Sequence, residues 1–227
     1  MIDIHSHFLF GVDDGSPNLE VSLNMLKRAY ADGVTDIICT PHYRSGVFEP
    51  DVSLIKANFE RLKSENPYPV NLYLGQEIAK CRDMFGLLKS GKVLTVNDSK
   101  YVLLEFKYVE DSEIENTVLD AVYSGYKPII AHVERYEYVK ERDIERFIDA
   151  GAYIQVNADS LVSKRGEYYK KRVEKYIRSE LVDFVANDMH YNREYCMKAA
   201  FDYVSKKFGK QVANALFIEN PEVLIEK

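Results

Sequence analysis

Histidine and carboxylate side chains recur where short β-rich runs of this sequence end. All five histidines follow or end such runs, and acidic residues hold matching positions. The candidate ligands are His5, His7, Asp14, His42, Glu77, Glu105, His132, Asp188 and His190. Imidazole and carboxylate donors suit manganese, iron or zinc, whereas Cu(I) and iron–sulfur sites prefer sulfur. The pattern therefore predicts a metal site.

Two pairs of candidate ligands are two residues apart, His5 with His7 and Asp188 with His190. Because residues i and i+2 of a strand project to one side, each pair can bind one ion. One tetrahedral zinc needs only about four ligands, so this larger set indicates two or three ions bridged by a carboxylate. Such a cluster lowers the pKa of a bound water to about 7 and offsets phosphoryl charge. Hydrolysis of phosphate esters is the expected chemistry.

Each histidine taken alone also allows a purely structural interpretation. A lone histidine is more often a surface residue or a hydrogen-bonded core residue than a metal ligand. The agreement of the whole set, and not any single member, favours the metal site.

Two arginines follow candidate ligands closely. Arg135 comes three residues after His132, and Arg44 comes two after His42. A guanidinium is the planar partner of a phosphoryl group, so Arg135 is expected to bind phosphate. For Arg44, phosphate binding and a solvated surface charge are left as equal alternatives.

The elements that must position these residues alternate regularly. Strands are expected at 2–4, 36–39, 70–74, 101–104, 128–131, 153–156 and 183–186. Helices are expected at 18–31, 52–63, 84–89, 112–124, 143–149, 168–178 and 194–207. This alternation predicts a parallel sheet covered by helices and favours its closure into a barrel, with the active site at the carboxyl ends of the strands. Residues 1–227 are expected to form one domain.

Composition excludes several classes of protein. The net charge of −6 argues against a nucleic-acid partner, which requires a positive surface. The three cysteines, Cys39, Cys81 and Cys196, contain no CxxC pair, which excludes a zinc ribbon and a disulfide framework. No signal peptide or membrane-spanning run is recognised, so a cytoplasmic protein without membrane insertion is expected.

Three other patterns carry little weight. The segment 86–92 reads as a P-loop, but Val93 replaces the Ser or Thr that would bind magnesium. Four residues separate Cys39 from Arg44, one fewer than in a cysteine-phosphatase loop. The basic run at 164–178 is interpreted as a solvated helix face, with a docking surface for an acidic partner as the alternative.

The ordered motifs resemble a known family. They are Met1-Ile2-Asp3-Ile4-His5-Ser6-His7, Asp13-Asp14-Gly15, Thr40-Pro41-His42, Gly75-Gln76-Glu77-Ile78, the segments 94–101, 103–106 and 130–136, Asn187-Asp188-Met189-His190 and Asn220-Pro221. Over nearly its whole length the chain resembles the polymerase-and-histidinol-phosphatase (PHP) superfamily. More narrowly, it resembles the bacterial CpsB-like protein tyrosine phosphatases of capsule and exopolysaccharide loci.

The resemblance implies a distorted (β/α)7 TIM-like barrel, the PHP fold, with a trinuclear manganese site built from all nine candidate ligands. It implies that Arg135 engages the phosphate and that a metal-bridging hydroxide attacks phosphorus. The family has a further arginine after the last metal histidine, usually in a longer loop. Here Tyr191-Asn192 alone separates His190 from Arg193, so the loop is shorter than is usual in the family. Arg193 is therefore named as a candidate substrate-binding residue.

The substrate implied by the resemblance is the phosphotyrosine tail of a membrane-associated bacterial tyrosine kinase that regulates polysaccharide export. A PHP phosphatase of a small metabolite, such as histidinol phosphate, is the main alternative. A phosphodiesterase or exonuclease is disfavoured by the negative charge, and a metal-holding module without turnover by the complete ligand set. The oligomeric state is left open.

Overall fold

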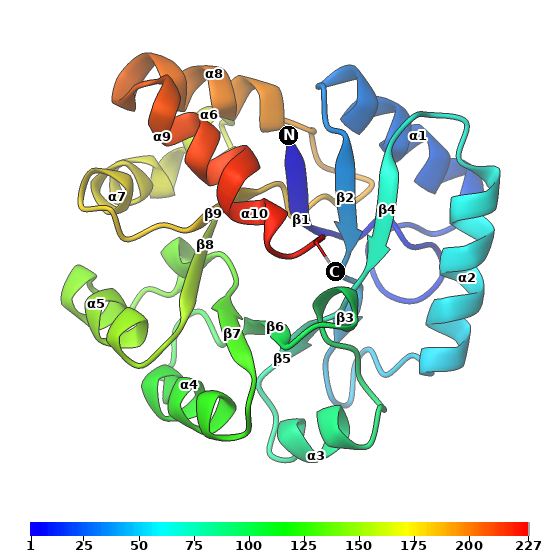
Figure 1. Ribbon diagram of the computed structural model, residues 1–227, viewed down its shortest axis with the longest axis horizontal. Helices are drawn as coiled ribbons and strands as arrows, with labels where there is room; N and C mark the ends of the chain where they lie inside the picture. The colour runs from blue at the N-terminus through cyan, green and yellow to red at the C-terminus, as the bar shows by residue number, and fades with distance from the viewer. Residues whose placement is uncertain (227) are drawn as a thin grey trace.

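A computed structural model of the protein describes residues 1–226. Parallel strands form a ring, and the helices lie outside it (Figure 1). The strands are β1 Ile2–Ser6, β2 Asp36–Cys39, β3 His42–Tyr43, β4 Asn71–Leu74, β5 Glu77–Ala79, β6 Tyr101–Glu105, β7 Lys127–Ile130, β8 Tyr153–Asn157 and β9 Phe184–Ala186. They pair in the orders β1-β2-β4 and β3-β5-β6-β7-β8-β9. The predicted α/β class is confirmed.

Two of the seven predicted strands are each continued as a second short strand. Thr40-Pro41 separates β2 from β3, and Gly75-Gln76 separates β4 from β5. Proline cannot donate a ladder hydrogen bond, so it interrupts the pairing. The break moves the second segments into the other sheet, where His42 pairs in parallel register with Glu77. The distortion of the barrel thus brings two candidate ligands side by side.

The ring closes between its first and last strands. Ser6 of β1 forms an isolated parallel bridge with Met189, which follows β9. The amide of Asp188 donates to the carbonyl of His5 at 2.8 Å, and the amide of His7 donates to the carbonyl of Met189 at 2.9 Å. Strand β1 is two residues longer than predicted, so His5 lies within it. Residues of the candidate site therefore also close the barrel, and the predicted distorted barrel is confirmed.

The predicted helices are all present, α3 with the predicted ends and the others with shifted ends. They are α1 Leu19–Ala31, α2 Val52–Glu65, α3 Met84–Lys89, α4 Ile114–Tyr123, α5 Glu141–Asp149, α7 Glu167–Arg178 and α8 Met197–Phe208. The sequence did not predict α6 Asp159–Val162, the 3-10 turns Val96–Asp98 and Val133–Arg135, or the C-terminal α9 Lys210–Asn214, π-helical Ala215–Glu219 and α10 Asn220–Glu222. Short turns such as α6 and the two 3-10 turns do not show helical periodicity. The C-terminal elements follow one another without a gap from Lys210 to Glu222, so a longer helical segment was missed there.

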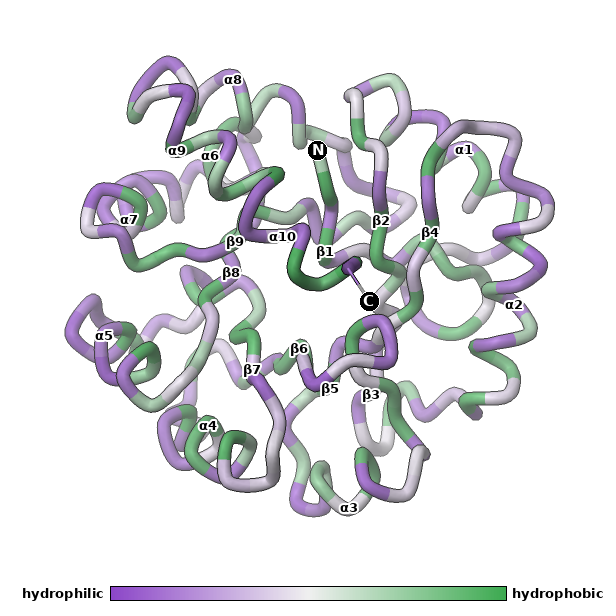
Figure 2. The backbone as a smooth tube through the Cα atoms, in the orientation of Figure 1, coloured by the Kyte–Doolittle hydropathy of each residue, from purple (hydrophilic) through white to green (hydrophobic). Residues whose placement is uncertain are grey.

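Apolar residues form two clusters. The larger lies between helices and strands, as the hydrophobic colouring of strands and inner helix faces indicates (Figure 2). The smaller joins residues from strands around the ring, among them Ile4, Leu103 and Ile129, with Leu224 near the C-terminus. Side chains from strands across the ring meet only inside it, so this cluster fills the barrel interior. Among residues 1–226, no helix combines the length and apolar character that a membrane span requires.

Candidate functional site

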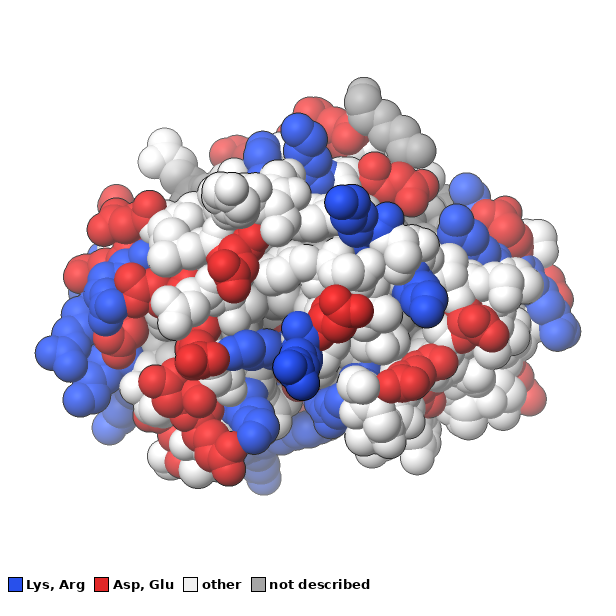
Figure 3. Space-filling model, turned by 90° about the horizontal axis from the view of Figure 1, so that it is seen from below, with Lys and Arg blue, Asp and Glu red and all other residues white. Residues whose placement is uncertain are grey.

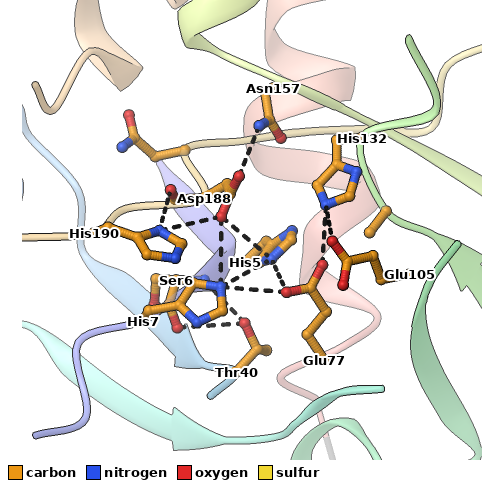
Figure 4. Close-up of polar contacts among 12 residues, drawn as sticks. His5, Ser6, His7, Thr40, Glu77, Glu105, His132, Asn157, Asp188 and His190 are labelled. Atoms are coloured by element: carbon orange, nitrogen blue, oxygen red, sulfur yellow. Dashed lines mark hydrogen bonds and ion pairs between the residues drawn. The ribbon is translucent and has the colours of Figure 1, made fainter. Parts of the chain in front are cut away.

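All nine predicted ligands lie together at one end of the barrel, and Figure 4 shows seven of them. Eight are buried, whereas the Asp14 side chain is 55% exposed. Seven of them form three groups whose donor atoms could hold a metal ion, namely His7, Asp14, His42 and His190, then His5, His7 and Glu77, and then His42, Glu77 and Glu105. His132 and Asp188 belong to none of these groups but contact their members. His7, His42 and Glu77 each belong to two groups, so the sites adjoin.

The hydrogen bonds of His5 and His7 turn the Nε2 atom of each ring toward the centre. His5 Nδ1 lies 3.0 Å from the amide oxygen of Gln155, and His7 Nδ1 lies 2.7 Å from the Asp13 carboxylate. Both partners are acceptors, so in the neutral rings Nδ1 carries the proton and Nε2 carries the lone pair. The Gln155 oxygen also accepts from the His132 amide, which fixes its orientation. Such partners are typical of metal-binding histidines.

Four acceptor atoms meet at the centre of this cluster. The Nε2 atoms of His5 and His7 are 3.3 Å apart, and Glu77 Oε2 lies 3.2 and 3.3 Å from them. Asp188 Oδ1 lies 3.7 and 3.4 Å from the same nitrogens. Neutral rings place no proton between these atoms, so only a proton or a cation makes the arrangement favourable. The donor set fits a divalent metal ion.

Glu77 links this centre to a second one. Its Oε1 lies 3.0 Å from His132 Nε2, and its Oε2 lies 2.9 Å from His42 Nδ1. The His42 contact lacks hydrogen-bond geometry, and both atoms are without a hydrogen-bond partner in the described chain. Two lone pairs that face one point without a shared proton are suited to a common cation. Glu77 is therefore placed to bridge two ions.

Two neighbours orient Glu105 at the edge of the site. Tyr108 donates to its Oε1 at 2.8 Å, and Arg44 donates to its Oε2 at 2.5 Å. Arg44 is 40% exposed at its side chain. Arg44 is thus engaged with a candidate ligand, and its predicted role in binding phosphate stays a prediction.

The third group opens to solvent through Asp14. Its Oδ1 lies 3.7 Å from His42 Nε2 and 3.5 Å from His190 Nε2. The hydrogen bond to His190 lowers the pKa of Asp14. A Cβ on Gly15 would lie 2.3 Å from the carbonyl oxygen of His7, so only glycine lets this loop approach the strand so closely.

Opposite charges balance within the buried cluster. Burial opposes charging of His5 and His7, but nearby carboxylates, those of Glu77 and Asp188 for His5 and that of Asp13 for His7, raise both pKa values. Burial alone would raise the pKa of Glu77, yet His5 and His42 hold it well below its usual range. Without metal, protons on histidines would neutralise the carboxylates. Metal ions and protons therefore compete for the same atoms.

The two oxygens of Asp188 serve different neighbours. Oδ1 faces the histidines, whereas Oδ2 accepts hydrogen bonds from Arg135 at 2.8 Å, Arg193 at 2.7 Å and Asn157 at 3.1 Å. Arg135 and Arg193 are 11% and 16% exposed at their side chains. Both arginines therefore lie beside the candidate metal centre, although the loop before Arg193 is short.

Two cavities adjoin the site. One, of about 340 Å³, is lined by Tyr108, Arg135, Asp159, Arg165, Gly166, Tyr169 and Arg193. The other is a groove of about 940 Å³ that includes Arg44, Glu105 and Tyr108 and extends along α3 and α4. Figure 3 shows the face that carries these helices, where basic and acidic residues surround a hollow. Tyr108 lines both cavities and separates them.

Backbone strain also marks this region. His132 has φ 32° and Asp188 has φ 51°, in the left-handed region that residues other than glycine rarely adopt. Each such residue costs about 1–3 kcal/mol and persists where the surrounding structure requires it. Both residues are candidate ligands, so the strain serves to aim their side chains.

Sequence reasoning missed the residues that support the ligands. Asp13, Gln155, Asn157 and Tyr108 each hydrogen-bond a candidate ligand. A signal for two of them was present, because Gln155 and Asn157 are polar residues at the end of the otherwise apolar strand β8.

Two of the other sequence patterns, the one beginning at Cys39 and the basic run at 164–178, are explained in part by burial and packing. Cys39 is 0% exposed, and burial followed by the charges of Asp3 and Asp13 raises its pKa, so its thiol is not a nucleophile. In the basic run, Arg172 donates to the Glu134 carbonyl at 2.7 Å and Lys170 lies over the ring of Tyr203. Part of this run therefore packs α7 against the barrel.

Comparison with known proteins gives one consistent result. The family model of capsular polysaccharide synthesis, CpsB/CapC, matches residues 1–226. Tyrosine-protein phosphatase CpsB of Streptococcus agalactiae is 35% identical over 240 residues, covering 100% of this chain and 98% of its own. Tyrosine-protein phosphatase YwqE of Bacillus subtilis is 30% identical over 233 residues, covering 99% and 91%.

Solved structures agree in fold. One crystal structure belongs to a study of YwqE from Bacillus subtilis and CpsB from Streptococcus pneumoniae, which describes them as unique metal-dependent tyrosine phosphatases. It matches with a TM-score of 0.91 at 30% identity and covers 99% of this chain and 94% of its own. A phosphotriesterase from Mycobacterium tuberculosis matches at TM-score 0.63 and 10% identity, which shows a shared fold alone.

Proposed function

The chain belongs to the CpsB/CapC family of capsular polysaccharide synthesis, and from this premise we propose that it is a metal-dependent protein-tyrosine phosphatase. Its reaction is the hydrolysis of a phosphoric monoester. Its substrate is the phosphotyrosine tail of a membrane-associated bacterial tyrosine kinase that regulates capsule or exopolysaccharide synthesis. The named relatives favour this substrate over a small metabolite such as histidinol phosphate.

One observation carries the proposal. Asp188 presents Oδ1 to the lone-pair nitrogens of His5 and His7 and Oδ2 to two arginines. A cation-binding centre and a pair of guanidinium groups are thereby held on opposite oxygens of one buried carboxylate. Metal-dependent hydrolysis of a phosphate monoester uses this combination, because a water is activated beside an anion whose charge is offset.

The nine residues His5, His7, Asp14, His42, Glu77, Glu105, His132, Asp188 and His190 are proposed as the metal ligands. Two or three Mn²⁺ ions are the proposed cofactor, with iron or zinc as alternatives that the donor types also suit. When bound, such ions lower the pKa of a water and offset negative charge on the phosphoryl group. Gln155 holds the ring of His5 and Asp13 holds the ring of His7, so that each Nε2 would be available to a metal ion.

The chain's own residues bind and orient the substrate. Arg135 and Arg193 are proposed to bind the phosphoryl oxygens, with Asp188 holding both guanidinium groups in place. Arg44 is proposed to assist from the other side, through its contact with Glu105. The leaving tyrosine has a pKa near 10, so its departure needs less help from a general acid than an alkoxide would.

Metal removal and substrate comparison test the proposal. Dialysis against a chelator should abolish hydrolysis of an aryl phosphate. Adding Mn²⁺ should restore this activity, and the measured metal content of the protein should rise with it. The restored enzyme should prefer a phosphotyrosyl peptide to an alkyl phosphomonoester in kcat/KM. Full activity in excess chelator would exclude the metal-dependent mechanism, and a preference for the alkyl ester would favour the metabolite alternative.

A further inference from the structure

The smaller cavity carries more positive charge than its two inner arginines supply. Arg135 and Arg193 are paired with Asp188, but Arg165 forms no ion pair within residues 1–226. Asp159 is the carboxylate of the lining, and it lies beyond ion-pair distance from Arg165. The cavity therefore presents a guanidinium with no countercharge in contact.

The electrostatic surroundings of Arg165 place it near the inner arginines. Partial burial, then repulsion from Arg193 and Arg135, lowers its pKa, and the attraction of Asp159 offsets this in part. Three guanidinium groups thus act on one another across a cavity of about 340 Å³. An anion that entered beside Arg165 would relieve this repulsion.

The backbone keeps Arg165 at the mouth of the cavity. The next residue, Gly166, is the N-cap of α7, and a Cβ there would lie 2.1 Å from the Asp159 carbonyl oxygen. Only glycine allows the turn to pack so tightly on α6. The first turn of α7, whose N-cap offers no side-chain acceptor, adds the partial positive charge of a helix N-terminus.

On the basis of the proposed phosphatase function, we propose that Arg165 binds a second anionic group of the substrate, on a residue next to the phosphotyrosine. The scissile phosphoryl group already has Arg135 and Arg193, which are nearly buried, whereas Arg165 is exposed at the cavity mouth. The rings of Tyr108 and Tyr169 line the space between. The preferred substrate is then a peptide with a carboxylate or a second phosphate beside the phosphotyrosine.

Binding of non-hydrolysable peptides tests this assignment. Three peptides carry phosphonomethyl-phenylalanine in place of phosphotyrosine, flanked by alanine, by glutamate or by a second phosphonomethyl-phenylalanine. Their Kd values are measured by fluorescence anisotropy for the metal-loaded protein, for Arg165→Gln and for Lys171→Gln. Lys171 is the matched control because it is an exposed cation on α7 that does not line the cavity.

The wild-type protein should bind an acidic peptide about tenfold more tightly than the alanine peptide, as expected for one partly exposed charge-assisted contact. Arg165→Gln should abolish this preference, and Lys171→Gln should keep it. If Arg165→Gln removes the tighter binding of the glutamate peptide, Arg165 binds a carboxylate. If it removes the tighter binding of the peptide with two phosphonates, Arg165 binds a phosphate. Equal weakening of all three peptides by Arg165→Gln, or no preference in the wild type, would overturn the proposal.

A turnover measurement separates this inference from the proposed function. The wild-type enzyme is assayed on a phosphotyrosyl peptide with neutral flanks. Hydrolysis of this peptide without any effect of acidic flanks on Kd would overturn the role of Arg165 alone. Failure to hydrolyse any phosphotyrosyl peptide would overturn the phosphatase function itself.

Discussion

Arg135 and Arg193 donate hydrogen bonds to the same atom, Oδ2 of Asp188, at 2.8 and 2.7 Å. They reach it from different segments, one just after β7 and the other after β9. The shared acceptor holds both guanidinium groups beside the candidate metal centre and leaves their other nitrogens for a ligand. Their contributions to binding should therefore be coupled.

Removal of either arginine should impair catalysis. Arg135→Ala and Arg193→Ala should each lower kcat/KM for an aryl phosphate by about 10²-fold, the scale of losing one charge-stabilising donor. Because both act on one anion, the double variant should lose less than the product of the single losses. Arg142→Ala, at a side chain 76% exposed on α5, is the control. Single losses within twofold of the control would contradict the assignment.

Asp13→Asn should weaken metal binding without removing a ligand. Asp13 accepts from His7 Nδ1 at 2.7 Å and from the His42 amide at 2.8 Å, so it orients two ligands at once. Loss of such a supporting partner typically costs about 10–100-fold in metal affinity or activity. Metal titration followed by calorimetry should show this loss, and excess Mn²⁺ should rescue activity. The control is Asp51→Asn at the start of α2, where the side chain makes no capping hydrogen bond. Unchanged metal affinity in Asp13→Asn would refute this role.

Stabilisation by metal should grow with pH. The pKa of His7 is raised because the Asp13 carboxylate outweighs the effect of burial. In the metal-free protein, its proton adds stability that is complete below the unfolded pKa of about 6.5 and lost as pH rises through the folded pKa. Glu77 and Asp188, whose pKa values are lowered, stay ionised throughout this range.

Thermal unfolding with and without Mn²⁺ at pH 6, 7 and 8 measures this effect. The gain in Tm on adding metal should increase with pH, by about 2–4 °C for each kcal/mol of extra stabilisation. A gain that is constant or largest at pH 6 would show that protons and metal do not share the site.

Cys39 should be dispensable for the reaction. Its side chain is 0% exposed, and burial raises its pKa, so no thiolate is available near neutral pH. Cys39→Ala should retain kcat/KM within about twofold, with a lower Tm because a buried side chain is truncated. Iodoacetamide should leave the native enzyme active, and Cys81, which is less buried, serves as the control for alkylation. Inactivation that tracks labelling of Cys39 would contradict a metal-based mechanism.

The sequence predicted the ligands better than it predicted their supports. His5, His7, Asp188 and His190 were predictable because rare residue types recurred where parallel strands end. Asp13 has no such signal in its type, since Asp is common in loops, and Gln155 stands out only as a polar residue in an otherwise apolar strand. Their roles depend on hydrogen-bond geometry that only the folded chain defines.

The same contrast holds for the fold. Alternating strands and helices indicated the barrel, because apolar periodicity survives in every long element. The breaks at Thr40-Pro41 and Gly75-Gln76 were not predicted, since each shifts a strand between two sheets by tertiary pairing. The short α6 and the π-helical turn at Ala215–Glu219 are likewise fixed by packing and not by local pattern.

Closure of the ring by β1 and the segment after β9 has a consequence for biogenesis. During translation, Asp188 and His190 are made 183 residues after His5 and His7 (188 − 5 and 190 − 7). A nascent chain therefore lacks the complete set of candidate ligands until the segment after β9 has been made. The candidate site is thus assembled only when the first and last strands of the ring meet.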